Sequence, residues 1–212
     1  MNQNVPIVFV IDDDFAVRRA IDALLQSAGL RVEGFSSASE FLQQPIPADP
    51  CCLVLDVRLP VMSGIELHRH LQSIKWSIPT IFITGHADIP MAVEAMKNGA
   101  IDFLTKPIRG QVLLDAILKA VRISEERTRV EALRRSVNSM TSREREVIEH
   151  VIAGWTNREI ASELGTGERN IKNHRANGMR KIGAKTVPEL VRMASKISMR
   201  HDFSRESAAR VG

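Results

Sequence analysis

The stretch Ile7-Val8-Phe9-Val10-Ile11-Asp12-Asp13 joins an apolar run rich in β-branched residues directly to two adjacent carboxylates. Such a run is typical of a buried strand. The arrangement recurs along the chain, because the apolar runs at 52–55, 80–83 and 101–104 are closely followed by Asp56, Thr84 and Lys106. The stretch therefore predicts one of several parallel strands that present polar side chains at a shared edge of a sheet.

The apolar runs alternate with helical stretches over the first half of the chain. A run at 32–35 completes a set of five, with four helical stretches between the runs and a fifth after them. This alternation predicts right-handed crossovers and a doubly wound α/β fold around a five-stranded parallel sheet. Ser37-x-x-Glu40 is typical of a capping box at a helix start. Gly29 and Gly99 stand where helices need a left-handed closing residue.

Charge is segregated between the two halves of this 212-residue chain, which is 44% hydrophobic and 25% charged. Residues 1–121 hold 10 basic and 13 acidic residues, a net charge of −3, whereas residues 122–212 hold 19 and 12, a net charge of +7. A basic half is attracted to a polyanion. No apolar run approaches the ~18 residues of a membrane span, and the N-terminus does not resemble a signal peptide. We therefore expect a cytoplasmic protein, with Cys51 and Cys52 as buried, reduced thiols.

Residues 122–138 are charged and lack glycine and proline, which predicts a helical linker that continues from the last helix of the first half. Val130, Leu133 and Val137 recur at spacings of three and four. Two interpretations stay open: a solvated helix, or the seam of a coiled-coil dimer.

The second half begins again with three patterns of the capping-box type, which start at Thr141, Thr156 and Thr186. Glycines at 154, 165 and 183 separate four short helices. Residues 158–181 within them are predicted to form a helix, a tight turn and a second helix. Residues 198–212 contain few apolar side chains and are expected to be a disordered tail.

The polar residues at the strand ends suggest phosphoryl chemistry. Three carboxylates, Asp12, Asp13 and Asp56, repel one another unless a divalent cation joins them, and their hard oxygens suit Mg²⁺. Lys106 and Thr84 are placed to neutralise a transferring phosphoryl group. A single Asp at a strand end is usually a helix cap, but all five residues together favour a phosphoacceptor site.

The helix predicted over residues 168–182 carries a basic stripe. At 100° per residue, one face holds Arg169, Lys172, Asn173, Ala176 and Arg180, and the other holds Ile171, Gly178, Met179 and Ile182. Such a helix can enter the major groove of DNA, with Lys172 and Asn173 reading base edges and Arg169, Arg175 and Arg180 holding phosphates. His174 lies between the faces and suits a structural or phosphate-contacting role better than metal binding. Outside a helix-turn-helix arrangement, a basic stripe of this kind would usually be a solvated helix face.

Two sets of motifs resemble known families. Residues 5–121 are similar to a two-component response-regulator receiver, through Val10-Ile11-Asp12-Asp13-Asp14, Leu55-Asp56-Val57-Arg58-Leu59-Pro60-Val61-Met62-Ser63-Gly64, Thr84-Gly85-His86 and Lys106-Pro107. Residues 78–106, with Asp88-Ile89-Pro90-Met91-Ala92-Val93, resemble the FixJ branch. Residues 140–197 resemble a LuxR/NarL-type helix-turn-helix domain, through Thr141-Ser142-Arg143-Glu144-Arg145-Glu146-Val147, Asn157-Arg158-Glu159-Ile160-Ala161 and Ile171-Lys172-Asn173-His174.

The receiver resemblance implies a flavodoxin-like fold and a role for each matching residue. Asp56 would be the phosphoacceptor, Asp13 and the Arg58 carbonyl would bind the metal, and Asp12 would act through water. Thr84 and Phe103 would change side-chain rotamer when the protein is phosphorylated. Phe103 can also be interpreted as a packed aromatic residue of the core. Lys106 would pair with the phosphoryl group, and the Lys106-Pro107 bond would be cis. The role of Asp14 is less defined.

The two resemblances imply domains at 1–121 and 139–197 and a transcription factor that is not an enzyme. Its partners would be a sensor histidine kinase, double-stranded DNA, RNA polymerase and, after phosphorylation, a second copy of the chain, without a membrane. A metal-dependent phosphohydrolase is the enzyme alternative, but Arg58 stands where it needs a second aspartate. A regulator that works only by protein contacts is a third interpretation. Thr166-Gly167 and Gly178 depart from the family pattern at the second helix, where Gly178 costs about 1 kcal/mol of helix stability.

Overall fold

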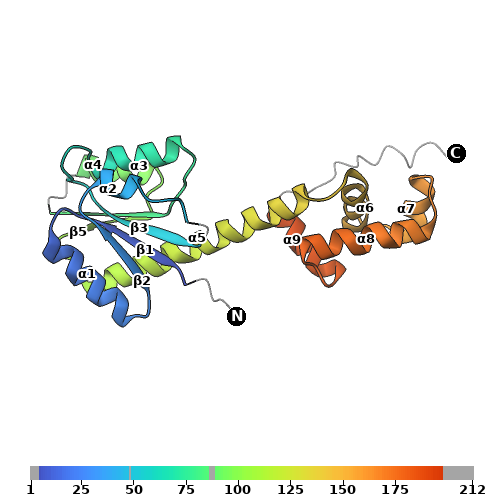
Figure 1. Ribbon diagram of the computed structural model, residues 1–212, viewed down its shortest axis with the longest axis horizontal. Helices are drawn as coiled ribbons and strands as arrows, with labels where there is room; N and C mark the ends of the chain where they lie inside the picture. Colours follow the sequence, from blue (N-terminus) through green and yellow to red (C-terminus); the bar gives the residue numbers. More distant parts are fainter. Residues whose placement is uncertain (1–4, 48, 86–88, 198–212) are drawn as a thin grey trace. The chain divides into compact units, whose positions relative to one another are not determined.

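The chain forms two compact units, residues 1–128 and 129–212, which are described separately. The computed structural model describes residues 5–47, 49–85 and 89–197 (Figure 1). The tail predicted over 198–212 and two motif residues, His86 and Asp88, lie outside the described residues. No helix within the described ranges is long and apolar enough to cross a membrane.

A five-stranded parallel sheet of strand order β2-β1-β3-β4-β5 forms the centre of the first unit. The strands are β1 Ile7–Ile11, β2 Arg31–Phe35, β3 Cys51–Asp56, β4 Thr80–Thr84 and β5 Asp102–Thr105. This order is the flavodoxin-like one, so the predicted fold is confirmed. Ile11 pairs with Leu55 and Asp56 pairs with Ile83. The register therefore brings the residues that follow β1 beside the end of β3.

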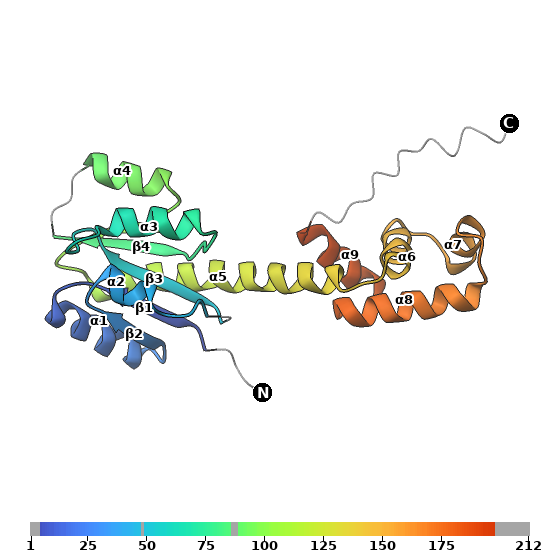
Figure 2. The same cartoon turned by 45° about the horizontal axis from the view of Figure 1, so that its top comes forward.

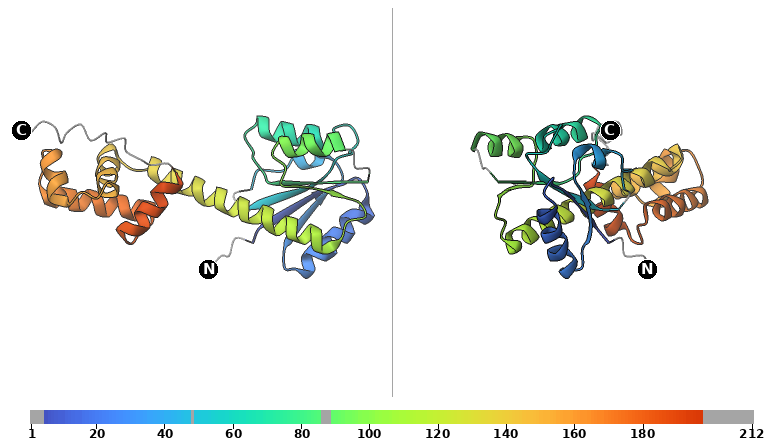
Figure 3. Two further views of the ribbon diagram at one scale, coloured as in Figure 1. Left: turned by 180° about the vertical axis from the view of Figure 1, so that it is seen from behind. Right: turned by 60° about the vertical axis from the view of Figure 1, so that its left-hand side comes forward.

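Helices cover both faces of this sheet. The helices of the first unit are α1 Phe15–Ser27, α2 Ala38–Leu42, α3 Gly64–Ser73, α4 Ile89–Lys97 and α5 Gly110–Asn138. In Figures 1 and 2, α1 and the start of α5 lie on one face, and α2, α3 and α4 lie on the other. Figure 3 shows the same division from behind. Each face has its own apolar core, centred on Leu25 and Ile117 on the first face and on Phe41 and Leu67 on the second.

The buried strand β3 begins with the two cysteines. Both thiols are free and buried, as predicted from the sequence. Burial raises the pKa of the Cys51 thiol to about 12, so the reactive thiolate form is scarce near neutral pH.

The helix caps of the first unit follow the sequence patterns, except that one predicted capping box is incomplete. Gly29 and Gly99 have positive φ values of 74° and 84°, as predicted. At α2, the Ser37 hydroxyl accepts from the Glu40 amide, but Glu40 accepts hydrogen bonds from the Ser36 amide and hydroxyl rather than from Ser37. The predicted capping box at Ser37 is therefore only half formed, because the carboxylate reaches one residue further back.

The second unit is a helical bundle. Its helices are α6 Ser142–Ile152, α7 Asn157–Glu163, α8 Glu168–Ile182 and α9 Val187–Lys196, so the four predicted helices are confirmed. Complete capping boxes start α6 at Thr141 and α7 at Thr156. The box predicted at Thr186 is incomplete, because the Glu189 carboxylate accepts from the Lys185 amide.

The helix predicted over 122–138 is present as the later part of α5, but neither of its two interpretations fits its last turns. Leu133 and Val137 are 6% and 5% exposed. They belong to the apolar core of the second unit, together with Val147 and Leu190. Because the bundle itself buries these two side chains, they are neither solvated nor available as a coiled-coil seam.

Earlier turns of α5 are anchored in the first unit. The Cys51 amide donates to the buried Ser124 hydroxyl at 2.9 Å, and Arg127 Nη1 donates to the Ser77 carbonyl at 2.6 Å. These contacts extend the first unit beyond residue 121, the predicted end of its domain, and the division between units falls between Thr128 and Arg129.

Candidate functional site

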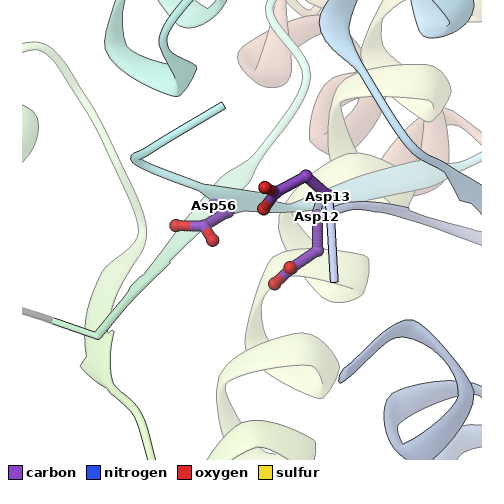
Figure 4. A group of neighbouring side chains, drawn as sticks. All are labelled: Asp12, Asp13 and Asp56. Atoms are coloured by element: carbon purple, nitrogen blue, oxygen red, sulfur yellow. The ribbon is translucent and has the colours of Figure 1, made fainter. Parts of the chain in front are cut away.

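The three predicted carboxylates meet at the carboxyl ends of β1 and β3. One oxygen from each of Asp12, Asp13 and Asp56 lies within 4.8 Å of the others. Figure 4 shows Asp12 and Asp13 side by side at the end of β1, with Asp56 at the end of the neighbouring strand. Asp12 and Asp56 are only 0% and 5% exposed, whereas Asp13 is exposed. The three acids thus form a cluster in which two are buried and one is exposed, and we call this cluster the acidic edge.

Lys106 joins two of these acids. Its Nζ lies 2.6 Å from Asp12 Oδ2 and 2.8 Å from Asp56 Oδ2. Burial lowers the pKa of Lys106, but the hydrogen bonds and charges of the two acids outweigh burial, so its pKa is raised. Burial raises the pKa of Asp12, and Lys106 only partly opposes it. The lysine is therefore held protonated against a carboxylate pair, at the position predicted from the sequence.

The donor set fits a small divalent cation. Asp12 Oδ2 is buried, and among the described residues its partner is the Lys106 ammonium, 2.6 Å away. Together with the oxygens of Asp13 and Asp56, this oxygen offers the hard ligands that Mg²⁺ prefers.

Gly64 shapes the loop behind Asp56. A Cβ atom at this position would lie 2.1 Å from the Asp56 carbonyl oxygen. The Gly64 amide donates to the Val57 carbonyl at 3.0 Å, and the Arg58 amide donates to Asp56 Oδ1 at 3.1 Å. Only glycine permits this close return of the chain, a reason that the motif alone did not reveal. The Arg58 side chain itself is exposed.

Thr84 and Phe103 lie on the strands next to the acidic edge. Thr84 ends β4 and is fully buried, and its carbonyl accepts from the Lys106 amide at 2.7 Å. Phe103 on β5 is half-buried, with its ring centroid 6.4 Å from that of Phe82 on the neighbouring strand. Phe103 thus touches the core and also keeps part of its surface in solvent. The Lys106-Pro107 bond is cis, as the resemblance implied.

The second candidate site is the outer face of α8, whose predicted bounds are confirmed. The residues assigned to this face are all exposed: Arg169, Lys172, Asn173, Ala176 and Arg180. On the opposite face, Ile171, Gly178 and Ile182 are buried and Met179 is half-buried. The division into a polar and a buried face therefore follows the predicted helix periodicity.

Arg175 and His174 differ from that exposed set, because both are half-buried. Arg175 Nη1 donates to Asn157 Oδ1 at 2.9 Å, which links α8 to the first turn of α7. Arg175 therefore has a structural contact that the sequence did not predict, beside its predicted contact with phosphate.

Gly178 is required by helix packing. A Cβ atom at this position would lie 2.5 Å from Cγ1 of Ile148 on α6. This departure from the family pattern, which lowers helix propensity, thus permits the close approach of α6 and α8. Gly167 begins α8 without a side-chain cap, and a Cβ there would meet no atom within 4 Å.

The sequence did not predict a polar contact between the end of α8 and the start of α6. Lys181 Nζ donates to Glu144 Oε2 at 2.6 Å and to the Ser139 carbonyl at 3.0 Å. Glu144 is 6% exposed and also completes the α6 capping box. The capping pattern identified Glu144 as part of a box, but it gave no signal for a partner 37 residues away.

Two protein families match the chain, one for each site. The response regulator receiver domain matches residues 8–118, and the luxR family of bacterial regulatory proteins matches residues 138–194. The chain is a two-component response regulator. It combines a receiver domain with a LuxR-type DNA-binding domain.

Similar proteins resemble this response regulator over most of their length. The response regulator protein TodT of Pseudomonas putida strain F1 is 42% identical, over 93% of this chain and 88% of its own. The transcriptional regulatory protein FixJ of Azorhizobium caulinodans is 43% identical, over 92% of this chain and 93% of its own. The solved structure of the response regulator StyR has a TM-score of 0.70 and 46% identity, over 90% of this chain and 98% of that one. Chains of this kind include transcriptional regulators of two-component systems.

Proposed function

We propose that Asp56 accepts a phosphoryl group from a sensor histidine kinase and that the phosphorylated protein binds DNA as a dimer. The bridge from Lys106 Nζ to Asp12 and Asp56, at 2.6 and 2.8 Å, is the observation that carries this proposal. An ammonium group at this place neutralises charge where a phosphoryl group would arrive. The proposed domains are a receiver domain at residues 1–121 and a DNA-binding domain at residues 139–197. The contacts of α5 add residues 122–128 to the first unit and residues 129–138 to the second.

The transfer is a simple displacement at phosphorus. A carboxylate oxygen of Asp56 bonds to phosphorus while the phosphorus–nitrogen bond of the kinase phosphohistidine breaks. The electron pair leaves with the imidazole, which is released neutral when its other nitrogen is protonated. The Arg58 amide orients Asp56 Oδ1, and Lys106 stabilises the charge on the phosphoryl oxygens.

Mg²⁺ is the proposed cofactor at the acidic edge. Asp12, Asp13, Asp56 and the Arg58 carbonyl would hold it, and Asp12 would act through water. When bound, Mg²⁺ supplies a Lewis acid for the phosphoryl oxygens. Three carboxylates converge here and Lys106 is shared between only two of them, which supports this assignment.

Phosphorylation of Asp56 is proposed to act by changing the packing of nearby side chains. The phosphoryl group adds about −1.5 to −2 charges. Thr84 would hydrogen-bond it, and the half-buried Phe103 would follow Thr84 inward. The outer face of α4 and β5 would then pair with a second copy. Exposed Val93 and Met96 on α4, at 45% and 47%, support a contact there.

In the DNA-binding domain, the outer face of α8 would enter the major groove. Lys172 and Asn173 would read base edges, with Ala176 beside them, and Arg169 and Arg180 would hold phosphates. Arg175 and His174, being half-buried, would contact phosphates from the side. The protein would act in the cytoplasm with RNA polymerase, and it would not be an enzyme with a separate substrate.

The test is labelling by a small phosphate donor in the presence of Mg²⁺. Wild type should acquire acid-labile phosphate, and Asp56→Asn should acquire none while its far-UV circular dichroism stays unchanged. Asp115→Asn removes an exposed carboxylate on α5 and is the matched control, which should label like wild type. Persistent labelling of Asp56→Asn would contradict the phosphoacceptor assignment and would favour a different acid.

A further inference from the structure

Arg18 on the first turns of α1 folds back onto the acidic edge. Its Nη1 atom donates to the carbonyl oxygen of Asp12 at 2.6 Å and to that of Asp13 at 3.1 Å. The side chain is half-buried. A cation thus lies directly behind two of the three carboxylates, and the transfer mechanism leaves it without a role.

Other hydrogen bonds fix the neighbours of Asp13. The Asp12 amide donates to the Phe35 carbonyl at 3.2 Å, and the Asp14 amide donates to Asp12 Oδ1 at 3.0 Å. Asp14 Oδ1 in turn accepts from the Ala16 amide at 2.7 Å and caps α1. These bonds orient Asp12 and Asp14. Arg18 supplies the bond to the Asp13 carbonyl, and through that peptide it influences the direction of the exposed Asp13 side chain.

The guanidinium group of Arg18 is itself held in place. Its Cζ lies 5.6 Å from the centroid of the Phe15 ring, a distance suited to a cation–π contact. Arg19, the next residue along α1, also lies over this ring, at 6.0 Å, and is exposed. The two arginines therefore share a helix, a charge and an aromatic neighbour, but the recorded bonds to the Asp12 and Asp13 carbonyls come from Arg18 alone among the described residues.

A cation beside a metal site can act in two opposite ways. Its charge repels the metal ion, so removing it would strengthen metal binding. Its hydrogen bonds can instead hold the ligand-bearing loop, so removing it would weaken metal binding. Arg18 directs its donor to backbone carbonyls rather than to carboxylates, so it does not compete with a metal for the carboxylate oxygens.

We infer that Arg18 is a positioning residue for the metal site, which keeps the carboxylates of Asp12 and Asp13 converged through their backbone. This inference rests on the proposed function, because it assumes that the acidic edge binds Mg²⁺. Arg18 acts through the Asp12 and Asp13 peptides and touches neither the phosphoryl group nor the ion.

The test is calorimetric titration of the full-length, unphosphorylated protein with Mg²⁺. Arg18→Met keeps the aliphatic stem and removes both the charge and the donor. Its dissociation constant should rise about tenfold, in the range seen when groups that orient metal ligands are removed. Arg19→Met is the matched control and should bind like wild type. Labelling of Asp56 by a small donor should need more Mg²⁺ in Arg18→Met but should reach the wild-type maximum at saturation.

Equal or tighter Mg²⁺ binding by Arg18→Met would overturn the inference, as would an equal loss in Arg19→Met. Melting curves recorded with a chelator check that each variant is folded. If Arg18→Met does not fold, Arg18→Lys takes its place, because lysine keeps the charge but lacks the planar, multi-donor guanidinium group. An intermediate loss of Mg²⁺ affinity in Arg18→Lys supports the positioning role of Arg18, and wild-type affinity overturns it. Failure of wild type to bind Mg²⁺ would instead overturn the proposed function.

Discussion

The acidic edge of the receiver domain and the outer face of α8 both depend on charged side chains, but different things hold those side chains in place. Asp12 and Asp56 are buried, paired with Lys106 and fixed by the register of β1 and β3. Lys172 and Asn173 are exposed, and the described part of the chain provides no ion pair or hydrogen bond for their side chains. The fold thus supplies polar partners for the buried acids of the receiver site, whereas it supplies none for Lys172 and Asn173 among the described residues.

This difference separates two kinds of mutational effect. A change that disturbs the acidic edge should damage both chemistry and stability, because buried charges lose their partners. A change on the outer face of α8 should damage affinity alone. Substitutions in the two regions can therefore test whether stability and affinity respond separately.

The largest effect is expected from Gly64→Ala. The new Cβ would lie 2.1 Å from the Asp56 carbonyl oxygen, so the backbone around Asp56 must shift. We expect a loss of receiver stability of about 3 kcal/mol, the upper end for overpacking, together with a large loss of Asp56 labelling. Gly34→Ala is the control, because its Cβ would make only an ordinary 3.8 Å contact. Urea unfolding and phosphate labelling measure both effects, and normal labelling of Gly64→Ala would contradict the geometry.

The α8 face is tested by Lys172→Ala and Arg180→Ala. Loss of Lys172 should cost ~1–3 kcal/mol at one preferred base, whereas loss of Arg180 should weaken all sequences alike and reduce the salt slope by about one. Binding to a panel of operator variants at several salt concentrations distinguishes the two. Both variants should unfold like wild type, because both side chains are exposed. If both variants lost the same affinity for every DNA sequence, the base-reading role of Lys172 would be contradicted.

Gly178→Ala tests the buried face of the same helix. Its Cβ would lie 2.5 Å from Cγ1 and 2.9 Å from Cδ1 of Ile148, so α8 or Ile148 must move. We expect a loss of about 1–2 kcal/mol in the DNA-binding domain, less than for Gly64 because a side chain yields more readily than backbone. Ile148→Ala removes both clashing atoms, and a double-mutant cycle in urea should therefore show favourable coupling. Additive losses would contradict the contact.

A smaller effect concerns pH and the Glu144–Lys181 pair. The hydrogen bond from Lys181 is the main cause that lowers the pKa of Glu144 below 4.5. The folded state thus holds the carboxylate more firmly than the unfolded state does. The stability from this pair is present above pH 4.5 and is lost as the pH falls through the lower folded pKa. Glu144→Gln should flatten the pH dependence of unfolding below pH 4.5, and an unchanged slope in thermal melts would argue against the pair.

The positions of the receiver-site residues were predictable from the sequence because each lies at the end of a strand or just after it. In a parallel sheet all strands end at one edge, so Asp12, Asp56, Thr84 and Lys106 were expected to converge. The faces of α8 were predictable for a similar reason, since helix periodicity alone decides them.

Contacts between distant parts of the chain could not be predicted in this way. The Ser124 hydroxyl meets the Cys51 amide 73 residues away, and Lys181 meets Glu144 37 residues away. The apolar spacing of Leu133 and Val137 was visible, but a short stripe does not reveal whether a partner helix or the same bundle buries it. Gly64 and Gly178 were visible as residues, and only the packing around them explains why they are glycines.

Phosphorylation of Asp56 is expected to control function through oligomeric state. If each DNA-binding domain inserts one helix, α8, a dimer would make the second half-site contact effectively intramolecular and would raise affinity by as much as ~10²–10⁴. Sedimentation of wild type and Thr84→Ala, with and without phosphate, tests this link directly. Wild type should dimerise on phosphorylation in parallel with its gain in operator affinity, and Thr84→Ala should accept phosphate yet dimerise poorly. A phosphorylated wild type that stays monomeric and still gains operator affinity would contradict the account.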